Sequence, residues 1–135
     1  MKQTIYLSGN DLDILESAIK YLPIISVQKG FLNGTIAFPA LDDLIQKRTN
    51  AVTAIKIDFN TDVVSLGEIL QVYAKLVDFD SPNEEENLKE KIYKKVISYP
   101  DLLIGIEAKA FIEENIGNSK NIEFTKMLNF FKYKK

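Results

Sequence analysis

The stretch of sequence that decides the fold is AVTAIKIDFNTDVVSLGEILQVYAKLV, residues 51–77. Its first part alternates, so that Ile55, Ile57 and Phe59 share one side of an extended chain while small or charged residues stand between them. Such alternation is typical of a strand with one buried face, because successive side chains of a strand point to opposite sides. We therefore predict a strand over residues 51–59.

A helix follows this strand and has the clearest start signal in the chain. Ser65 and Glu68 have the Ser-x-x-Glu spacing of a capping box, in which each side chain satisfies a backbone N–H of the other residue. Apolar residues then recur every three or four positions, as they do along one face of a helix. They are Leu66, Ile69, Leu70, Tyr73, Leu76 and Val77.

The N-terminal part of the chain shows a related order of elements. Residues 4–8 are β-prone, and Gly9-Asn10-Asp11 has the composition of a turn and a helix N-cap. The helix that follows runs to about Tyr21 and ends before Pro23, which cannot continue it. Its predicted apolar face consists of Leu12, Leu15, Ala18, Ile19 and Leu22. Residues 25–31 alternate and predict a second strand.

The C-terminal part supplies the remaining elements. Residues 92–99 alternate, which predicts a strand whose second face is partly exposed to solvent. A third helix precedes Gly117, a residue suited to the C′ position. Its predicted apolar face consists of Leu103, Ile106, Ala108, Phe111, Ile112 and Ile116. Residues 121–128 predict a last strand, and Phe130 and Phe131 are predicted to pack back on the core ahead of a solubilising tail.

Two longer connections separate these elements. Residues 33–50 form a connection of a length that is often functional. Residues 78–90 are acidic, and Asp78 and Asp80 have the spacing that opens a calcium loop, but Pro82 occupies the next ligand position. This segment therefore predicts a solvated linker without a metal ion.

The order of the predicted elements is β-α-β followed by β-α-β with a further helix and strand. This order indicates helices packed on one face of a mainly antiparallel sheet. The predicted fold class is therefore α+β, an α/β sandwich of the ferredoxin-like type, and we expect a single domain over residues 1–135.

The composition excludes several kinds of chemistry. The 135 residues include no Cys, His or Trp, and 17 basic residues against 19 acidic ones leave a formal charge of −2. Without Cys and His there are no thiol nucleophiles, disulfides, imidazole bases or ordinary zinc and haem ligands. We therefore expect neither a cofactor nor a metal. The small net charge offers no general attraction to phosphates, so no nucleic-acid partner is expected.

The sequence also indicates the compartment in which the protein is found. No stretch approaches the roughly 18 consecutive apolar residues that a membrane span needs. The start of the chain leads straight into strand-like sequence rather than into a signal peptide, so we expect a cytoplasmic protein with no membrane partner.

The glycines match no nucleotide-binding fingerprint, so nucleotide hydrolysis is not expected. Asp42-Asp43, and Asp11 with Asp13, are the available acid–base pairs, but Asp near a helix start is first of all a cap or dipole partner.

Several short motifs occur at a spacing found in a known family. They are Gly9-Asn10-Asp11-Leu12, Leu22-Pro23, Gly30-Phe31-Leu32-Asn33-Gly34, Thr49 through Ile55, and Val63-Val64-Ser65-Leu66. In this order they resemble the G-C-F-W, L-P-G-V, G-Y-x-G-G, T-G-H-A-E-A-V and V-I-S-Y motifs of peptide methionine sulfoxide reductases of the A type. The resemblance covers residues 4–78, and Tyr93-Lys94-Lys95 is similar to the family's later Y-R-S strand.

This resemblance implies both a fold and a reaction. The implied fold is an α+β core of ferredoxin-like type, in agreement with the order of elements. In the implied reaction a Cys thiolate attacks the sulfoxide sulfur, Phe and Trp hold the methyl group, and Glu and Tyr hydrogen-bond the sulfoxide oxygen. Sulfenic acid formation and its resolution need at least one Cys, and this chain has none.

The family's functional positions fall on residues of a different chemistry here. By the resemblance, the Cys position falls on Asn10 or, in the alternative register, on Asp11. The Phe and Trp positions fall near Asp11 and Leu12, and the Glu position falls on Thr53. The remaining positions are Leu41 for the loop Tyr, Ala51 for the motif His and Tyr93 for the strand Tyr. These replacements predict a family member without the catalytic Cys and without the reaction.

Two classes of function stay open. In the first, the protein is a noncatalytic relative that binds a peptide, small molecule or protein through the former cleft. In that case the region from Asn10 to Leu12, with Leu41 and Thr53, lines a shallow and more neutral pocket, unless side chains have closed it into core. In the second, the chain is an enzyme with new acid–base chemistry that uses Asn10, Asp11, Thr53 or Tyr93. An unrelated α+β domain is the third interpretation.

Overall fold

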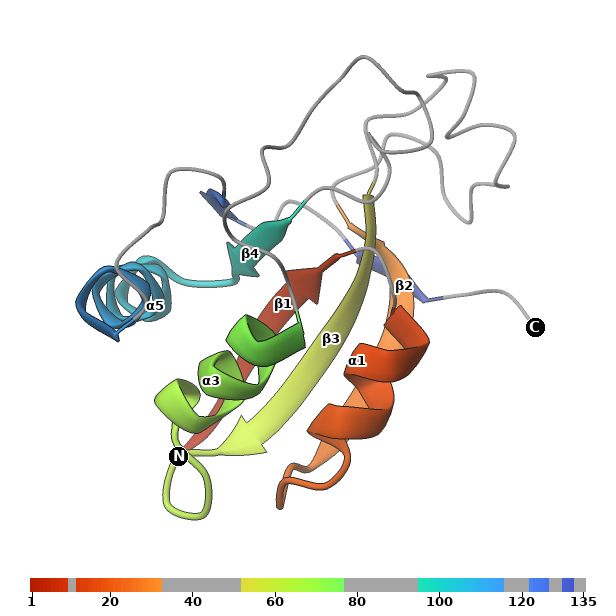
Figure 1. Cartoon of the computed structure of the whole chain (residues 1–135), viewed down its shortest axis with the longest axis horizontal. Helices are drawn as coiled ribbons and strands as arrows, with labels where there is room; N and C mark the ends of the chain where they lie inside the picture. Colours follow the sequence, from red (N-terminus) through yellow and green to blue (C-terminus); the bar gives the residue numbers. More distant parts are fainter. Residues whose placement is uncertain (10–11, 33–51, 77–94, 116–121, 127–129, 133–135) are drawn as a thin grey trace.

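The computed structural model describes residues 1–9, 12–32, 52–76, 95–115, 122–126 and 130–132. These residues form six strands and three helices (Figure 1): β1 Lys2–Ser8, α1 Leu12–Ile19, β2 Ser26–Leu32, β3 Val52–Asn60, α3 Leu66–Leu76, β4 Val96–Tyr99, α5 Leu102–Asn115, β5 Glu123–Lys126 and β6 Phe130–Lys132. Within these ranges no helix is long and apolar enough to cross a membrane. The predicted acidic linker of residues 78–90 lies outside the described ranges.

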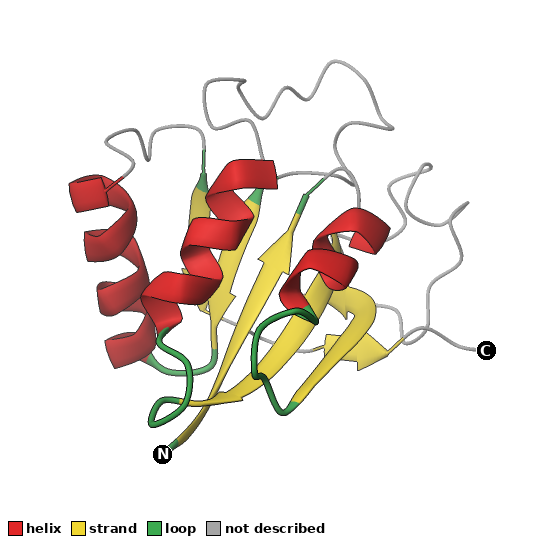
Figure 2. Cartoon of the chain, turned by 60° about the horizontal axis from the view of Figure 1, so that its bottom comes forward, coloured by secondary structure: helices red, strands yellow, loops and turns green. Residues whose placement is uncertain are grey.

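The strands make one sheet in the order β5-β4-β1-β3-β2-β6. Neighbouring strands run antiparallel except β4 and β5, which are parallel. The helices α1, α3 and α5 lie on one face of this sheet (Figure 2). The β4-β1-β3-β2 order, with α1 and α3 as the crossovers, is the ferredoxin-like arrangement. The predicted α+β class, with helices on a mainly antiparallel sheet, is confirmed.

The segment from β3 to α3 supplies the centre of the core. Ile55, Ile57 and Phe59 are fully buried on the side of β3 that faces the helices, as the alternation predicts. Helix α3 packs against them with the stripe Leu66, Ile69, Leu70 and Tyr73. Burying each large apolar side chain contributes about 1.5–3 kcal/mol. Leu76 was predicted in the same stripe but is exposed, because the helix ends there.

The predicted capping box fixes the start of α3. The backbone N–H of Glu68 donates to Ser65 Oγ at 3.1 Å, and Ser65 Oγ lies 3.3 Å from Glu68 Oε1. The backbone N–H of Ser65 in turn donates to Glu68 Oε1 at 3.5 Å. Two N–H groups that the helix itself cannot satisfy therefore have side-chain acceptors.

Helix α1 is shorter than predicted. It ends at Ile19 rather than near Tyr21, and the next residues form a tighter turn in which Tyr21 N–H donates to Ala18 O at 3.2 Å. Such a final turn is a common way for a helix to end. Leu22 then packs against the core ahead of Pro23, so the apolar pattern is satisfied outside the helix.

The face of the sheet opposite the helices is more buried than predicted. Val96 is 3% exposed and Ser98 is fully buried, so the prediction that this face of β4 is partly solvated was wrong. Tyr6 and Phe130 lie over this face with ring centroids 5.4 Å apart. The small residue Ala54 lies in the same cluster. Aromatic rings resting on a small residue therefore make a second, smaller core.

Polar groups on the same face tie three strands together. Asp58 of β3 accepts hydrogen bonds from Thr4 Oγ1 of β1 at 2.5 Å and from Ser26 Oγ of β2 at 3.0 Å. Both donors stand directly opposite Asp58 in the strand register. Burial, and to a smaller extent the Asp58 carboxylate, raises the pKa of Tyr6.

The end of the chain contains a strand that the sequence did not predict. Residues 130–132 form β6, which pairs antiparallel with β2 and places Phe131 opposite Phe31. Phe130 packs on Tyr6, so its prediction as a residue packing back on the molecule is confirmed. Three residues are too few for an alternating pattern to be recognised. The predicted last strand over residues 121–128 is the shorter β5.

Helix α5 buries only part of the predicted stripe: Ala108 and Ile112 are buried as predicted, and Phe111 is partly buried against the core. Leu103 and Ile106 are 74% and 57% exposed, whereas the buried residues are Ile104, Gly105, Ala108 and Ile112. The helix is apolar on both sides at its start, so spacing alone could not select the buried side. Gly105 determines which side of the helix faces the sheet, because a Cβ at this position would lie 2.7 Å from two ring atoms of Tyr99. Only a residue without a side chain allows α5 to lie this close to β4.

We predict that Gly105→Ala lowers the free energy of unfolding by about 1–2 kcal/mol, measured by urea denaturation. Alanine favours a helix over glycine by roughly 1 kcal/mol. The added methyl group, however, would overlap three Tyr99 ring atoms at 2.7–2.8 Å, and this overpacking outweighs the gain.

Ile106→Ala in the same helix is the control, because its side chain is 57% exposed and its loss should change stability by less than about 0.5 kcal/mol. A Gly105→Ala protein as stable as the parent would show that Tyr99 does not limit the approach of α5.

Candidate functional site

One end of the sheet brings together the segments that the sequence analysis singled out. β1 ends there, α1 begins there, and β3 and β4 start there (Figure 1). The register pairs Leu7 with Ile55 and Ser8 with Val96. If the β1–β3 register is continued by two residues, Gly9 stands opposite Thr53. If the β1–β4 register is continued by one residue, Gly9 stands opposite Lys95. This end of the sheet is the candidate functional site.

The structure describes two of the seven predicted site positions. Leu12 is the first residue of α1 and is 8% exposed, and Thr53 is the second residue of β3 and is 5% exposed. Both therefore lie at the candidate site, and both are buried. Asn10, Asp11, Leu41, Ala51 and Tyr93 lie outside the described residues, so a pocket shared by all these positions stays a prediction.

A buried hydrogen bond closes the end of β1. The Tyr73 hydroxyl of α3 donates to the Ser8 carbonyl at 2.5 Å, and both residues are fully buried. Ser8 Oγ accepts from Val96 N–H at 3.0 Å and lies 3.2 Å from the Val96 carbonyl. At this point the Ser8 side chain thus binds β4, while its carbonyl binds α3. The last residue of β1 is fixed from two sides.

Sequence reasoning missed this role of Tyr73. The residue was assigned to the apolar stripe of its helix, and its ring does lie in the core. A Tyr in such a stripe carries a hydroxyl that needs a partner when buried. That requirement was the available signal, but it does not say which carbonyl the hydroxyl reaches. Burial raises the pKa of Tyr73 far above its ordinary value of 10.0, so the phenol stays a neutral donor.

A lysine is buried next to this hydrogen bond. Lys95 directly precedes β4 and is only 7% exposed. Its backbone carbonyl accepts the N–H of Glu123 at 3.0 Å and so begins the pairing with β5. The sequence analysis placed Lys95 in an alternating strand with a partly solvated face, and its burial was not predicted. Lysine is rarely this buried, so the position is unusual for this residue type.

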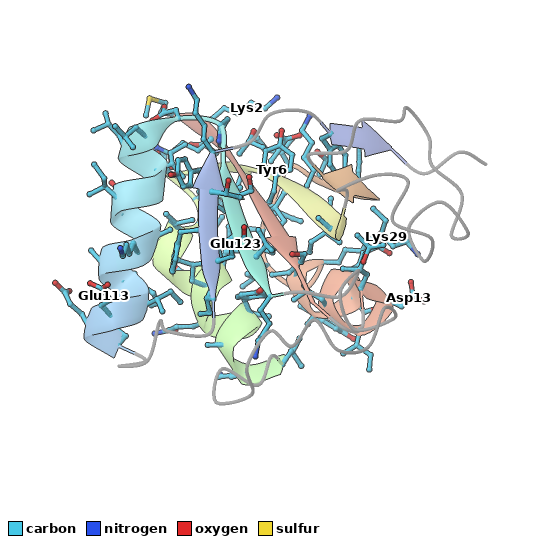
Figure 3. All side chains as sticks on the ribbon, turned by 90° about the horizontal axis from the view of Figure 1, so that it is seen from above. Lys2, Tyr6, Asp13, Lys29, Glu113 and Glu123 are labelled. Atoms are coloured by element: carbon cyan, nitrogen blue, oxygen red, sulfur yellow. The ribbon has the colours of Figure 1, made fainter. Side chains whose placement is uncertain are left out.

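An exposed ion pair lies beside the start of α1. Lys29 Nζ of β2 is 2.6 Å from Asp13 Oδ1 of α1 (Figure 3). Asp13 is therefore engaged in holding the helix against β2, a structural role for one member of the acid–base pair considered from the sequence. Among the residues that the structure describes, no three or more Asp and Glu side chains gather closely enough to hold a metal ion.

Fold and site together define a ferredoxin-like α+β protein whose candidate site lies where β1 leads into α1. Residues 3–133 match the sequence model of the family described as peptide methionine sulfoxide reductase. The chain therefore belongs to the peptide methionine sulfoxide reductase family, as the resemblance implied.

Curated relatives support this assignment. The chain is 33% identical over 88 residues to peptide methionine sulfoxide reductase MsrA of Malacoplasma penetrans, covering 64% of this chain and 55% of that protein. It is 25% identical over 100 residues to MsrA of Picrophilus torridus, covering 73% of this chain and 56% of that protein. The matches thus span little more than half the length of these relatives.

Solved structures share the fold. Mxr1 from Saccharomyces cerevisiae in reduced form has a TM-score of 0.83 at 14% identity, covering 99% of this chain and 81% of that chain. Methionine sulfoxide reductase A of Corynebacterium diphtheriae has a TM-score of 0.82 at 14% identity, covering 98% of this chain and 70% of that chain. The arrangement of strands and helices is therefore retained at low sequence identity.

We predict that Tyr73→Phe lowers the free energy of unfolding by about 1–2 kcal/mol at neutral pH, because the Ser8 carbonyl loses its donor while it stays buried. The variant should also lose part of the alkaline pH dependence. In the unfolded chain the phenol releases its proton near its ordinary pKa of 10.0, whereas the folded protein retains it. The stability that depends on the neutral phenol is complete below that pH and is lost as the pH rises above it.

Urea denaturation at about pH 7 and about pH 11 measures both effects. Tyr21→Phe serves as the control, since Tyr21 is 91% exposed and its hydroxyl should not affect stability. Equal stability and equal pH dependence of the Tyr73→Phe variant and the parent would contradict the assigned role.

Proposed function

We propose that this chain is a noncatalytic member of the peptide methionine sulfoxide reductase family that binds a ligand at the candidate site. One observation carries the proposal: the 135 residues contain no Cys. The reaction that the resemblance implies begins with a thiolate attacking sulfur and proceeds through a sulfenic acid, and no other side chain forms that intermediate.

The retained scaffold supports a binding role. The Tyr73–Ser8 hydrogen bond holds the end of β1, and the Asp13–Lys29 ion pair ties α1 to β2. Both contacts flank the segment on which the family's Cys position falls. The buried hydrogen bond does most to fix these surroundings, because the ion pair is exposed and contributes little. A fixed binding site lowers the entropy cost of binding a ligand. The expected ligand is a peptide, a small molecule or a protein segment.

The alternative is an enzyme with new acid–base chemistry, and the described residues favour it less. Burial raises the pKa of both Tyr6 and Tyr73. A phenol with a raised pKa is neutral at physiological pH and is a poor general base there.

We predict that the protein does not reduce free or peptide-bound methionine sulfoxide with thioredoxin or dithiothreitol as reductant. Asn10→Cys and Asp11→Cys, which place a thiol at the two candidate positions, should remain at least about 100-fold slower than an active family member. The missing Glu and Tyr hydrogen-bond donors are each expected to cost on the order of 10²–10³ in rate.

An active MsrA assayed in parallel is the positive control. Turnover by the parent chain above a no-protein control would contradict the proposal. A Cys variant within about tenfold of the active enzyme would show that the oxygen-binding groups are still present.

We predict that a ligand changes the amide NMR signals of Gly9, Leu12 and Thr53 and leaves those of Thr61 and Asp62 unchanged. The first group lies at the candidate site, and the second lies in the turn after β3, at the other end of the sheet. Capped, uncharged peptides containing methionine or methionine sulfoxide are the first probes. If another surface responds to these peptides while Gly9, Leu12 and Thr53 do not, the former site is not the binding site.

A further inference from the structure

Lys95 is a buried lysine at the candidate site. Its residue is only 7% exposed, although ammonium groups are strongly hydrated and costly to remove from water. By the resemblance of Tyr93-Lys94-Lys95 to the family's Y-R-S strand, position 95 carries a lysine where that motif has a serine.

The register places Lys95 and Thr53 on either side of Gly9. Lys95 stands next to Gly9 across the β1–β4 pair, and Thr53 stands next to it across the β1–β3 pair. With neighbouring strands about 4.8 Å apart, the two Cα atoms are roughly 10 Å apart. Gly9 contributes no side chain between them, and the stem of lysine is long and flexible.

Both residues are expected on the face that carries the helices. Thr53 alternates with Ile55 and Ile57, which are buried under the helices. Continuing the alternation of β4 by one residue puts Lys95 on the side of Ile97, another member of that core. Glu123 stands beside Val96 in the register and so belongs to the opposite face.

The charge of the site is therefore changed relative to the family motifs. The family's Glu position falls on the neutral Thr53, and the family's Ser position falls on Lys95. By the resemblance, this end of the sheet therefore has a neutral side chain in place of a carboxylate and a lysine in place of a serine. Since Coulombic interactions are stronger away from water, a buried ammonium selects strongly for a negatively charged group.

The geometry points to an oxyanion, a carboxylate or a phosphate, as the group that this site binds, with Lys95 supplying the charge and Thr53 a hydroxyl. This inference rests on the proposed binding function and adds the chemical class of the ligand. Neither side chain is without a partner in the structure. A bound oxyanion therefore joins or replaces an existing contact of these groups.

The test is an NMR titration of the folded full chain with three small probes at constant ionic strength. Acetate and acetamide have nearly the same shape and differ in charge, and inorganic phosphate distinguishes a phosphate site from a carboxylate site. We expect acetate or phosphate to shift the amide signals of Gly9, Thr53 and Val96 in a saturable manner, and acetamide not to do so.

Three variants identify the cation. Lys95→Gln should weaken binding of the responding anion by about tenfold or more, while Lys95→Arg, which keeps the charge, should retain the response. Lys56→Gln is the matched control, because Lys56 lies on the same sheet in β3 but on the face of Ala54, away from the helices, and it should bind as the parent does. If Lys95→Gln does not fold, comparison of the parent, Lys95→Arg and Lys56→Gln with acetate and acetamide still tests the charge requirement.

The outcomes separate this inference from the proposed function. Equal binding by Lys95→Gln and the parent, or equal shifts with acetate and acetamide, overturns the oxyanion assignment. If the uncharged peptides bind at Gly9 and Thr53 while both anions fail, the binding function stands and the oxyanion assignment is wrong. If neither the anions nor the peptides shift these signals, both are wrong.

Discussion

The hydrogen bond from the Tyr73 hydroxyl to the Ser8 carbonyl is the contact on which the candidate site depends. It joins α3 to the last residue of β1 inside the core, where an unsatisfied carbonyl would cost free energy. β1 is a central strand, with β4 on one side and β3 on the other. Fixing its end therefore also fixes where the chain leaves the sheet toward α1.

Around this contact the family's fold is kept. The positions that build the fold, such as the buried stripe of α3 and the helix-facing side of β3, retain apolar residues. The positions that the resemblance assigns to the reaction carry Asn10 or Asp11, Leu12 and Thr53 instead of Cys, aromatic residues and Glu. Most of the core is therefore built from other side chains than those that the resemblance assigns to the reaction.

Much of the fold could be predicted because local rules and tertiary packing agree along most of the chain. The Ser65 and Glu68 spacing predicts a helix start, and the structure has the capping box there. The alternation from Ile55 to Phe59 predicts a strand with one buried face, and these residues are buried in β3. Prediction failed where a segment was too short for a pattern, as in β6, or apolar on two sides, as at Leu103 and Ile106. In those places a partner strand or a neighbouring ring decides the outcome.

The sequence by itself determined the fold class, the family and the absence of a thiol in this chain, because periodicity, motif spacing and composition are all local properties. Only the tertiary structure decided which polar groups are buried at the candidate site. Ser8, Tyr73 and Lys95 come from separate parts of the chain, and each reads locally as an ordinary strand or helix residue. Their burial follows from the order of β4, β1 and β3 in the sheet and from the position of α3 above it, and no local pattern encodes that arrangement.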